Sequence, residues 1–269
     1  RSGAWTEEDW RKDFLRKMKR HTGRNGMAFE SLTESSHDAW IHLYRGHAFS
    51  RETQISYYLE GELTMMELDM ELRKRSKGAH GVCDLMALLC DRHALECEPT
   101  MRLGVTHADI RKALTSMKGG GRLGAMLDRM VTRKQAPDME RTMAYFGLNL
   151  EPEHPIKEGE VQPAWLGLNL SMKAGKVTVS THMSASPLRM ILMPGDEIIA
   201  IDGRRTSNTK SLESALKGKI GQQVKMTYAH EGMLRTCSIE LPAAPRHNVK
   251  LSGKGNQKWR DYIATRQEK

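Results

Sequence analysis

Few residues of this chain combine the types and the spacing that catalysis or metal binding requires. Cys83, Cys90 and Cys97 recur every seven residues, and His93 lies between the last two. On a continuous helix Cys90, His93 and Cys97 would share one face, as zinc ligands do, whereas Cys83 would lie about 10 Å away along the axis. Because free cysteine is among the most buried residue types, we expect core cysteines here rather than a metal site.

Two further motifs, a phosphate-binding loop and a zinc-binding helix, are incomplete or missing in this sequence. Lys118 and Arg122 flank three glycines, but the spacing of a phosphate-binding loop and its preceding strand are missing, so we expect a connector between helices. The His-Glu-x-x-His helix, which supplies two zinc ligands and a general base, occurs nowhere in residues 1–269. We therefore predict no metal site and no cofactor in this chain. Zinc would enter only if an upstream half supplied the ligands.

The composition is that of a folded protein with a basic charge balance. The chain has 269 residues, 39% of them hydrophobic, a net charge of +9 and a pI near 9.4. Such a charge permits contact with RNA or an anionic surface. Four cysteines without paired spacing favour a reducing interior, and the mitochondrial matrix fits both features. No apolar run is long enough to cross a membrane. The chain opens at Arg1 without an initiator methionine, and we expect that a preceding segment was removed or is missing.

Up to about residue 150, apolar residues recur at helical spacing. Trp10, Phe14 and Met18 mark a first helix that Thr6 can cap. Thr106, with an aspartate three residues later, has the pattern of a capping box. The predicted helices cover about residues 6–20, 35–44, 54–74, 82–93, 106 onward and 123–133. In the third of these we place Glu62, Glu67, Asp69 and Glu71 mostly on the solvent side.

After residue 150 the pattern alternates, as in strands. We predict strands at residues 177–179, 197–201, 224–228 and 237–241, with a Pro194-Gly195 turn before the second and an amphipathic helix between the second and third. Together with Leu166-Gly167-Leu168, this order resembles a PDZ domain of the kind fused to bacterial and organellar proteases. PDZ domains bind peptides, so the second half of the chain is expected to bind peptide rather than transform it.

The PDZ resemblance implies a particular peptide site. The backbone N–H groups of Leu166, Gly167 and Leu168 would surround the carboxylate at a peptide's C-terminus, and the peptide would add to the following strand. Leu212 and Leu216 would line the facing helix. Met190-Ile191 stands where the family has a smaller Ala-Gly pair, so a narrowed groove and a PDZ domain kept only for packing remain open.

The first half resembles the glycyl aminopeptidase family, zinc metallopeptidases with a PDZ domain near the C-terminus. The similar segments occur in the family's order at Glu34–Ile41, Ile55–Gly61, Leu68–Arg73, Gly104–Thr106 and Phe146–Leu150. The resemblance implies an α+β multi-domain protein: a helical bundle, the C-terminal lobe of a gluzincin-like peptidase, followed by a PDZ β-barrel. The expected boundaries are 1–150 for the helical lobe, 151–160 for a linker, 161–243 for the PDZ domain and 244–269 for a basic tail.

The resemblance gives a chemical role to one position. Tyr58, with Tyr57 as its neighbour, matches a tyrosine that donates a hydrogen bond to the oxyanion of the tetrahedral intermediate. Glu60 replaces the family's lysine nearby. The alternative is that both tyrosines only pack the start of a helix.

Three functions remain open. We favour a non-catalytic peptidase-like scaffold or assembly subunit in a larger organellar complex, one that contains RNA if the basic surface contacts it. The alternatives are the C-terminal part of an active PDZ-bearing glycyl aminopeptidase, whose zinc site lies on a missing upstream segment, and a peptide-binding PDZ adaptor. The tail from Lys250 to Lys269 is expected to gain order only by docking, on its own lobe through Trp259 or on a partner.

Overall fold

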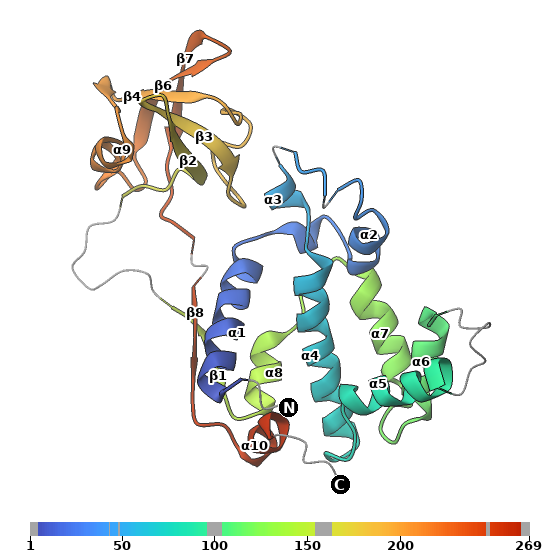
Figure 1. Cartoon of the computed structure of the whole chain (residues 1–269). Coiled ribbons are helices and arrows are strands. Elements are labelled where there is room, and N and C mark those ends of the chain that lie inside the picture. Colours follow the sequence, from blue (N-terminus) through green and yellow to red (C-terminus); the bar gives the residue numbers. More distant parts are fainter. Residues whose placement is uncertain are drawn as a thin grey trace.

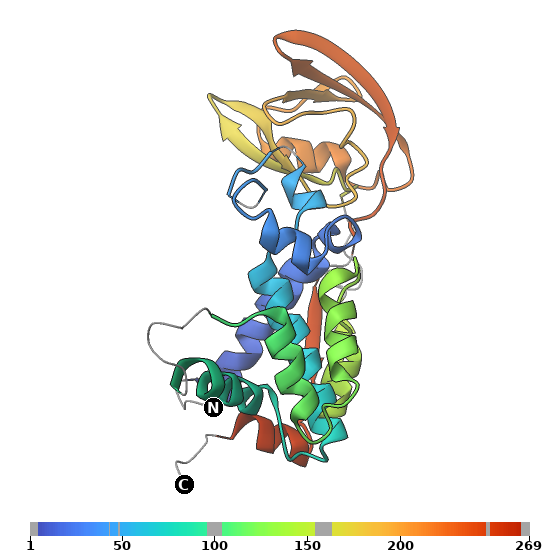
Figure 2. The same ribbon diagram turned by 90° about the vertical axis from the view of Figure 1, so that its right-hand side faces the viewer.

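The computed structural model describes residues 5–42, 44–47, 49–95, 104–153, 163–245 and 248–264. These form a helical lobe and a β-rich domain that lies at one end of it (Figures 1 and 2). The helices of the lobe are α1 Glu7–Thr22, the short 3-10 turn Gly26–Ala28, α2 Leu32–His37, α3 Ser50–Thr53, α4 Tyr57–Arg75, α5 Val82–Cys90, a π turn at Asp91–Leu95, α6 His107–Ser116, α7 Leu123–Thr132, α8 Met139–Tyr145 and α10 Gln257–Ile263.

Local sequence signals place several of these helices. Thr6 caps α1 and Thr106 caps α6, each in a reciprocal capping box with the aspartate three residues later, which confirms both predicted starts. The predicted helix at 35–44 is wrong in its extent, because α2 begins at Leu32 and ends at His37. Asp38 leaves the helical conformation with φ −94° and ψ 14°, and turns follow it.

Helix α4 is the centre of the lobe. Leu63 on one of its faces packs into a core with Phe14 of α1 and Met143 of α8, while Leu68 on another face packs into a core with Leu114 of α6. Figure 1 shows α4 between α1 and α8 on one side and α5 and α7 on the other. A helix surrounded in this way has little surface for water.

The burial of α4 corrects the sequence prediction for its acidic residues. Glu67, Asp69 and Glu71 are buried instead of facing solvent. Arg141 binds both glutamates, and Asp69 pairs with its own helix neighbour Arg73 at 2.6 Å. A buried carboxylate is tolerated when it has such partners, so the pairing replaces hydration.

The C-terminal segment docks on the helical lobe through Trp259, one of the two kinds of docking expected for the tail at 244–269. Strand β8 (Val249–Ser252) pairs antiparallel with β1 (Asn149–Pro152), and α10 inserts Trp259 into the lobe core. Trp259 Nε1 donates a hydrogen bond to Glu7 Oε1 at 3.0 Å. The β-rich domain is therefore inserted between two strands that both belong to the lobe (Figure 1).

The inserted domain has the four strands predicted from the alternating pattern, seen as β3, β4, β6 and β7, and two further strands, β2 and β5. They are β2 Leu168–Lys173, β3 Lys176–His182, β4 Glu197–Ile201, β5 Arg204–Arg205, β6 Gln223–His230 and β7 Met233–Glu240, with helix α9 Thr209–Leu216. The sheet order is β2-β3-β4-β6-β7, with β5 paired to β4 and all pairs antiparallel. Asp202-Gly203 makes the turn between β4 and β5 with both residues at positive φ.

A small interface joins the two domains through α3. The ring of Phe49 stacks on His182 of β3 with 5.4 Å between centroids and 11° between planes. Beside it, the buried Glu52 pairs with Arg189 of the inserted domain. None of the described helices is long and apolar enough to span a membrane.

Candidate functional site

The segment Leu166-Gly167-Leu168 forms a tight loop just before β2. Gly167 has φ +67°, and a Cβ atom there would lie 2.6 Å from the Cα of Ser186. Both the positive φ and this close approach require glycine. Ser186 Oγ donates to the Leu166 carbonyl at 3.0 Å, and the Met183 N–H donates to the Gly167 carbonyl at 2.7 Å. The carbonyls are thus fixed by the neighbouring segment.

The backbone N–H groups of the same loop, unlike its carbonyls, have no such partner among the described residues. Within the described ranges, no hydrogen bond outside the regular helices and strands is donated by the backbone N–H of Leu166 or Gly167. Backbone N–H groups almost always find an acceptor. A pair of them held at the start of a strand can bind a carboxylate, as PDZ loops do.

Strand β2 supplies the second part of the site. Among the described strands β2 pairs only with β3, so it forms one edge of the sheet. Its first three residues are half-buried and its last three are exposed. An unpaired edge presents N–H and C=O groups to which an extended peptide can add as a further strand.

Helix α9 carries Leu212 and Leu216, the two residues expected to line the peptide groove. Leu212 and Leu216 are only 2% and 3% exposed and lie in the domain core with Val224 and Ile201. They therefore support the domain from within, and the half-buried Ala215 is the apolar residue of α9 at the edge of that core.

The two side chains of the bulky pair Met190-Ile191 lie in different environments. Met190 is 75% exposed, whereas Ile191 is half-buried and packs against the domain core. The side chain of Met190 therefore lies mainly in solvent.

The two tyrosines with an implied chemical role lie at the start of α4. Tyr58 is 64% exposed, and its ring centroid lies 4.2 Å from that of the half-buried Tyr57. Hydrogen bonds from Tyr57 and then Tyr44 lower the pKa of Tyr58. The same bond to Tyr58 raises the pKa of Tyr57, with burial and Tyr44 adding to it. Of the two, Tyr58 is thus the more acidic hydroxyl.

Glu60 does not place an unpaired charge beside these tyrosines. It is buried, and its Oε2 lies 2.8 Å from Nδ1 of His21 on α1. The sequence showed the replacement of the family's lysine but not its partner, because His21 and Glu60 meet only when α1 packs on α4.

The cysteine prediction needs correction. Cys83 and Cys90 are exposed, Cys237 is half-buried, and Cys97 lies outside the described residues. In the part of the chain that the structure describes, no group of three His, Cys, Asp or Glu side chains could hold a metal ion. These residues do not fit a catalytic zinc, which needs three protein ligands.

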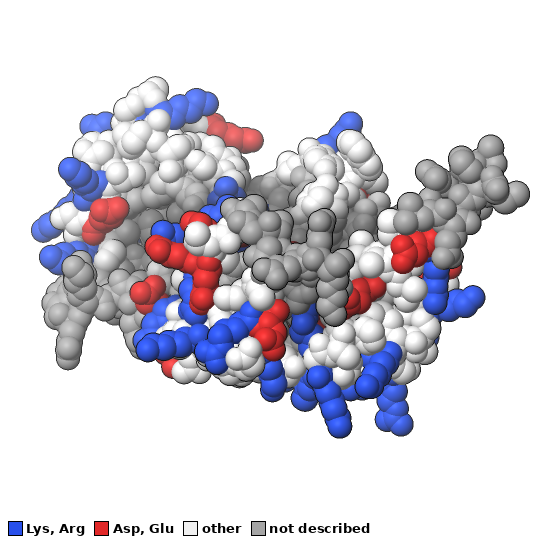
Figure 3. Space-filling model, turned by 60° about the horizontal axis from the view of Figure 1, so that its bottom comes forward, with Lys and Arg blue, Asp and Glu red and all other residues white. Residues whose placement is uncertain are grey.

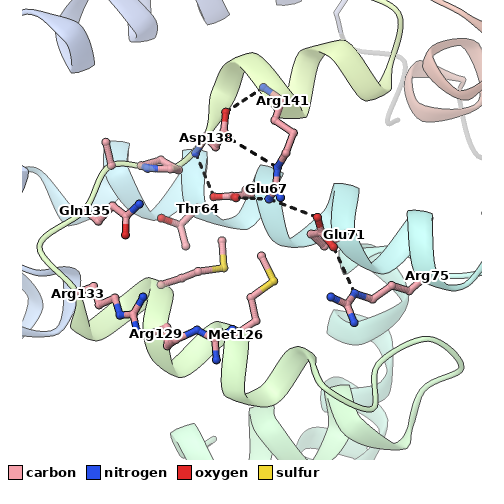
Figure 4. Close-up of a pocket in the computed structure, with 13 residues that line it drawn as sticks. Thr64, Glu67, Glu71, Arg75, Met126, Arg129, Arg133, Gln135, Asp138 and Arg141 are labelled. Carbon is pink, nitrogen blue, oxygen red and sulfur yellow. Dashed lines mark hydrogen bonds and ion pairs between the residues drawn. The ribbon is translucent and has the colours of Figure 1, made fainter.

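A cavity of about 340 Å³ lies between α4, α7 and the start of α8 (Figure 4). On one wall Arg141 Nη2 bonds Glu67 Oε1 at 2.8 Å and Glu71 Oε1 at 3.3 Å, and Arg75 also bonds Glu71. Met126 rises from α7 on the other side (Figure 4). The Glu67 and Glu71 carboxylates of the cavity are thus paired with guanidinium groups.

Surface charge is mixed in sign. On the face shown in Figure 3, Lys and Arg side chains gather along the lower margin, and Asp and Glu side chains lie among them and toward the centre. On this face the basic side chains are therefore interspersed with acidic ones.

The fold and the loop define a helical lobe of peptidase type that carries an inserted PDZ domain. Residues 1–64 match the sequence model of the M61 glycyl aminopeptidase family, and residues 164–241 match that of the PDZ domain. The chain is therefore a peptidase-related, PDZ-bearing protein, and its PDZ domain supports binding of peptide or protein. No curated protein matches it in sequence.

Among solved structures, an aminopeptidase N family protein from Idiomarina loihiensis aligns with 98% of this chain at a TM-score of 0.82 and 19% identity. This likeness shows a shared fold, and the chain spans 45% of that protein's length. The PDZ domain of a carboxy-terminal protease from Vibrio cholerae, solved with a peptide, aligns with 30% of this chain and 94% of its own at 18% identity and a TM-score of 0.26. The HtrA-type protease AlgW with a decapeptide aligns over 41% of this chain and 36% of its own, at 18% identity and a TM-score of 0.30.

Proposed function

We propose that this protein binds the C-terminal segments of polypeptides through its PDZ domain. The peptide carboxylate accepts hydrogen bonds from the loop at Gly167, and the peptide backbone pairs with the free edge of β2. The observation that carries the proposal is the loop itself, whose carbonyls are fixed by Ser186 and Met183. The N–H groups of Leu166 and Gly167 have no backbone acceptor outside the regular elements of the described chain.

We place this docking within a non-catalytic scaffold or assembly subunit of a larger organellar complex. Residues 1–269 contain no His-Glu-x-x-His, and the described residues hold no three-ligand metal cluster. The basic charge and the cysteine usage support a reducing interior such as the mitochondrial matrix, with an RNA-containing partner for the basic surface.

The docking proposal is tested by calorimetry with peptides that end in an apolar residue. We expect the free acid to bind and the C-terminal amide of the same peptide to bind at least about tenfold more weakly, because the amide loses the charge-assisted hydrogen bonds of the loop. Equal affinity for both forms, or no binding of any peptide in the set, would refute carboxylate docking.

A matched pair of glycine variants locates the site. Gly167→Ala introduces both the strain of a positive φ and a contact with Ser186, so we expect it to abolish peptide binding. Gly175→Ala, between β2 and β3, has φ +74° but nothing within 4 Å of the new Cβ, and is expected to keep binding. Thermal unfolding of both variants separates loss of the site from loss of the fold. If both variants fold and lose peptide binding equally, the loop at Gly167 is not the site that binds the carboxylate.

A second candidate function is the C-terminal part of an active zinc aminopeptidase, and the exposed Tyr58 with its lowered pKa favours it. In this case the chain alone should hold no stoichiometric zinc and hydrolyse no aminoacyl amide. One tightly held zinc per chain by elemental analysis, with chelator-sensitive hydrolysis, would overturn that expectation.

If a separately supplied zinc-bearing half restores hydrolysis, Tyr58→Phe should lower kcat by about 10²–10³ with little change in KM, as loss of an oxyanion donor does. Tyr145→Phe, which removes a hydroxyl elsewhere in the lobe, is the control. An unchanged rate for Tyr58→Phe would remove this residue from the chemistry.

A further inference from the structure

The contact between α3 and the inserted domain falls on the segment that fixes the loop before β2. We name residues 182–189 the supporting segment. At its first residue, the ring of His182 stacks on Phe49, with 5.4 Å between centroids and 11° between planes. At its last residue, Arg189 pairs with the buried Glu52 of α3. The helical lobe therefore holds the supporting segment at both ends.

The supporting segment is bonded directly to the loop. The Met183 N–H donates to the Gly167 carbonyl at 2.7 Å, and Ser186 Oγ donates to the Leu166 carbonyl at 3.0 Å. In the ladder between β2 and β3, His182 lies opposite the first residue of β2. A shift of the supporting segment would therefore move the backbone of the loop and change the direction of the loop's N–H groups.

The ring of His182 is held by one hydrogen bond and by packing. His182 is 1% exposed, and its Nε2 donates to the Leu192 carbonyl at 2.7 Å. Its Nδ1 is buried and has no hydrogen-bond partner in the part of the chain that the structure describes. A buried polar atom without a partner gains a hydrogen bond when water reaches it. Because Phe49 covers one face of this ring, the position of His182 depends on Phe49.

Helix α3 is itself fixed to the helical lobe. The N–H of Ile55, two residues after α3, donates to Glu30 Oε2 at 3.0 Å, and Ser35 Oγ donates to the Ile55 carbonyl at 3.1 Å. Ile55 is also buried in a small core with Met27 and Leu32. The lobe therefore sets the position of α3, and α3 in turn contacts the supporting segment.

We propose that Phe49 and Glu52 are positioning residues for the peptide site, and that they couple the helical lobe to peptide docking. The inference rests on the docking proposed above: a loop whose N–H groups must face the peptide carboxylate binds it more tightly when the segment behind the loop is held. Coupling between two sites is reciprocal, so a bound peptide also strengthens the contact of α3 with the supporting segment. A partner of the lobe that displaced α3 would therefore weaken peptide binding.

The test titrates the full chain and its variants by calorimetry with a free-acid peptide and with its C-terminal amide. Phe49→Ala should weaken binding of the free acid by about fivefold or more and change binding of the amide less. Phe49→Tyr keeps a ring for the stack and should bind like the unchanged protein. Glu197→Gln is the control, because it removes an ion pair with Lys176 at the opposite end of β3 from His182, and it should leave both affinities unchanged.

The ion pair is tested by a double-mutant cycle. Glu52→Gln and Arg189→Gln should each weaken binding of the free acid. The double variant should lose less than the two single losses combined, because both replacements remove the same interaction. Thermal unfolding shows which variants are folded. Additive losses in folded variants would mean that the pair does not act as a unit on the peptide site, which would overturn the role of Glu52.

Reciprocity supplies a second readout on the lobe. The N–H groups of residues 52–54 donate to the carbonyls of Phe49 and Ser50. A saturating free-acid peptide should slow their hydrogen exchange in the unchanged protein and not in Phe49→Ala. Equal free-acid affinity of Phe49→Ala, Glu52→Gln and the unchanged protein, or unchanged exchange in α3, would overturn the coupling and leave carboxylate docking intact. No binding of the free acid to the unchanged protein would overturn both.

Discussion

Gly167 shows what a single residue contributes to the candidate site. Its positive φ and its close approach to Ser186 set the direction of the loop. The N–H of Met183, the residue after β3, donates a hydrogen bond to the Gly167 carbonyl and so ties the loop to the end of that strand. The sequence predicted this position because a glycine between two leucines before a strand is a local pattern. It could not predict that Leu212 and Leu216 turn into the core, since that depends on how α9 lies against the sheet.

At the residue scale, the tyrosine group makes a prediction about ionisation. Because Tyr58 accepts hydrogen bonds from Tyr57 and Tyr44, its pKa lies below the ordinary value of 10.0, and that of Tyr57 lies above it. Absorbance at alkaline pH should therefore show an early ionisation step from Tyr58, ahead of Tyr57. Tyr58→Phe should remove this early step, and Tyr44→Phe should move it to higher pH.

The control for this titration is Tyr145→Phe, because burial raises the pKa of Tyr145 and its removal should leave the early step intact. An early step that persists in Tyr58→Phe would mean that another hydroxyl is the acidic one, and would contradict the hydrogen bonds assigned to Tyr58.

At the scale of elements, the chain divides into parts that local sequence specifies and parts that it does not. The starts of α1 and α6 follow from Thr6 and Thr106, whose capping boxes span only four residues. The pairing of β1 with β8 joins segments about a hundred residues apart, so neither strand carries a sufficient local signal. The buried Glu67 and Glu71 were misplaced because their partner Arg141 comes from α8.

The docking of α10 predicts a large stability effect for one residue. Trp259 is fully buried among Trp10, Phe146 and Tyr262, so Trp259→Ala should lower the free energy of unfolding by about 3–5 kcal/mol. Trp40→Ala, which truncates an exposed tryptophan, should change it by less than about 0.5 kcal/mol. Denaturant unfolding of both variants makes the comparison. Equal, small effects would mean that α10 does not pack on the lobe in solution.

The same contact gives the lobe a defined acid sensitivity. Burial acts to raise the pKa of Glu7, but hydrogen bonds from Trp259 and Arg11 outweigh it, so the pKa lies below the ordinary 4.5. A lowered carboxyl pKa contributes stability that is present above the ordinary value and is lost as pH falls through the folded-state value. As the pH drops below about 4.5, the free energy of unfolding of Trp259→Phe should therefore fall less than that of the unchanged protein, because the variant lacks the hydrogen bond to Glu7.

At the scale of the whole molecule, the PDZ domain is held at three places. Its two connections return to the paired strands β1 and β8, and α3 contacts it through Phe49 and Glu52. The order of the two domains could be predicted from the change in periodicity near residue 150. Docking of the tail on the helical lobe through Trp259 could be expected as well, but the pairing of β8 with β1 could not, because the two strands lie far apart in the sequence.

The central claim is that peptides dock on β2 beside the Gly167 loop, and amide hydrogen exchange on the full chain tests it most directly. The two edge strands β2 and β7 provide an internal comparison, since both belong to the same sheet. A saturating free-acid peptide is predicted to slow exchange at residues 166–173 and to leave residues 233–240 unchanged. Protection confined to β7, or none at the loop and β2 under saturation, would contradict the account.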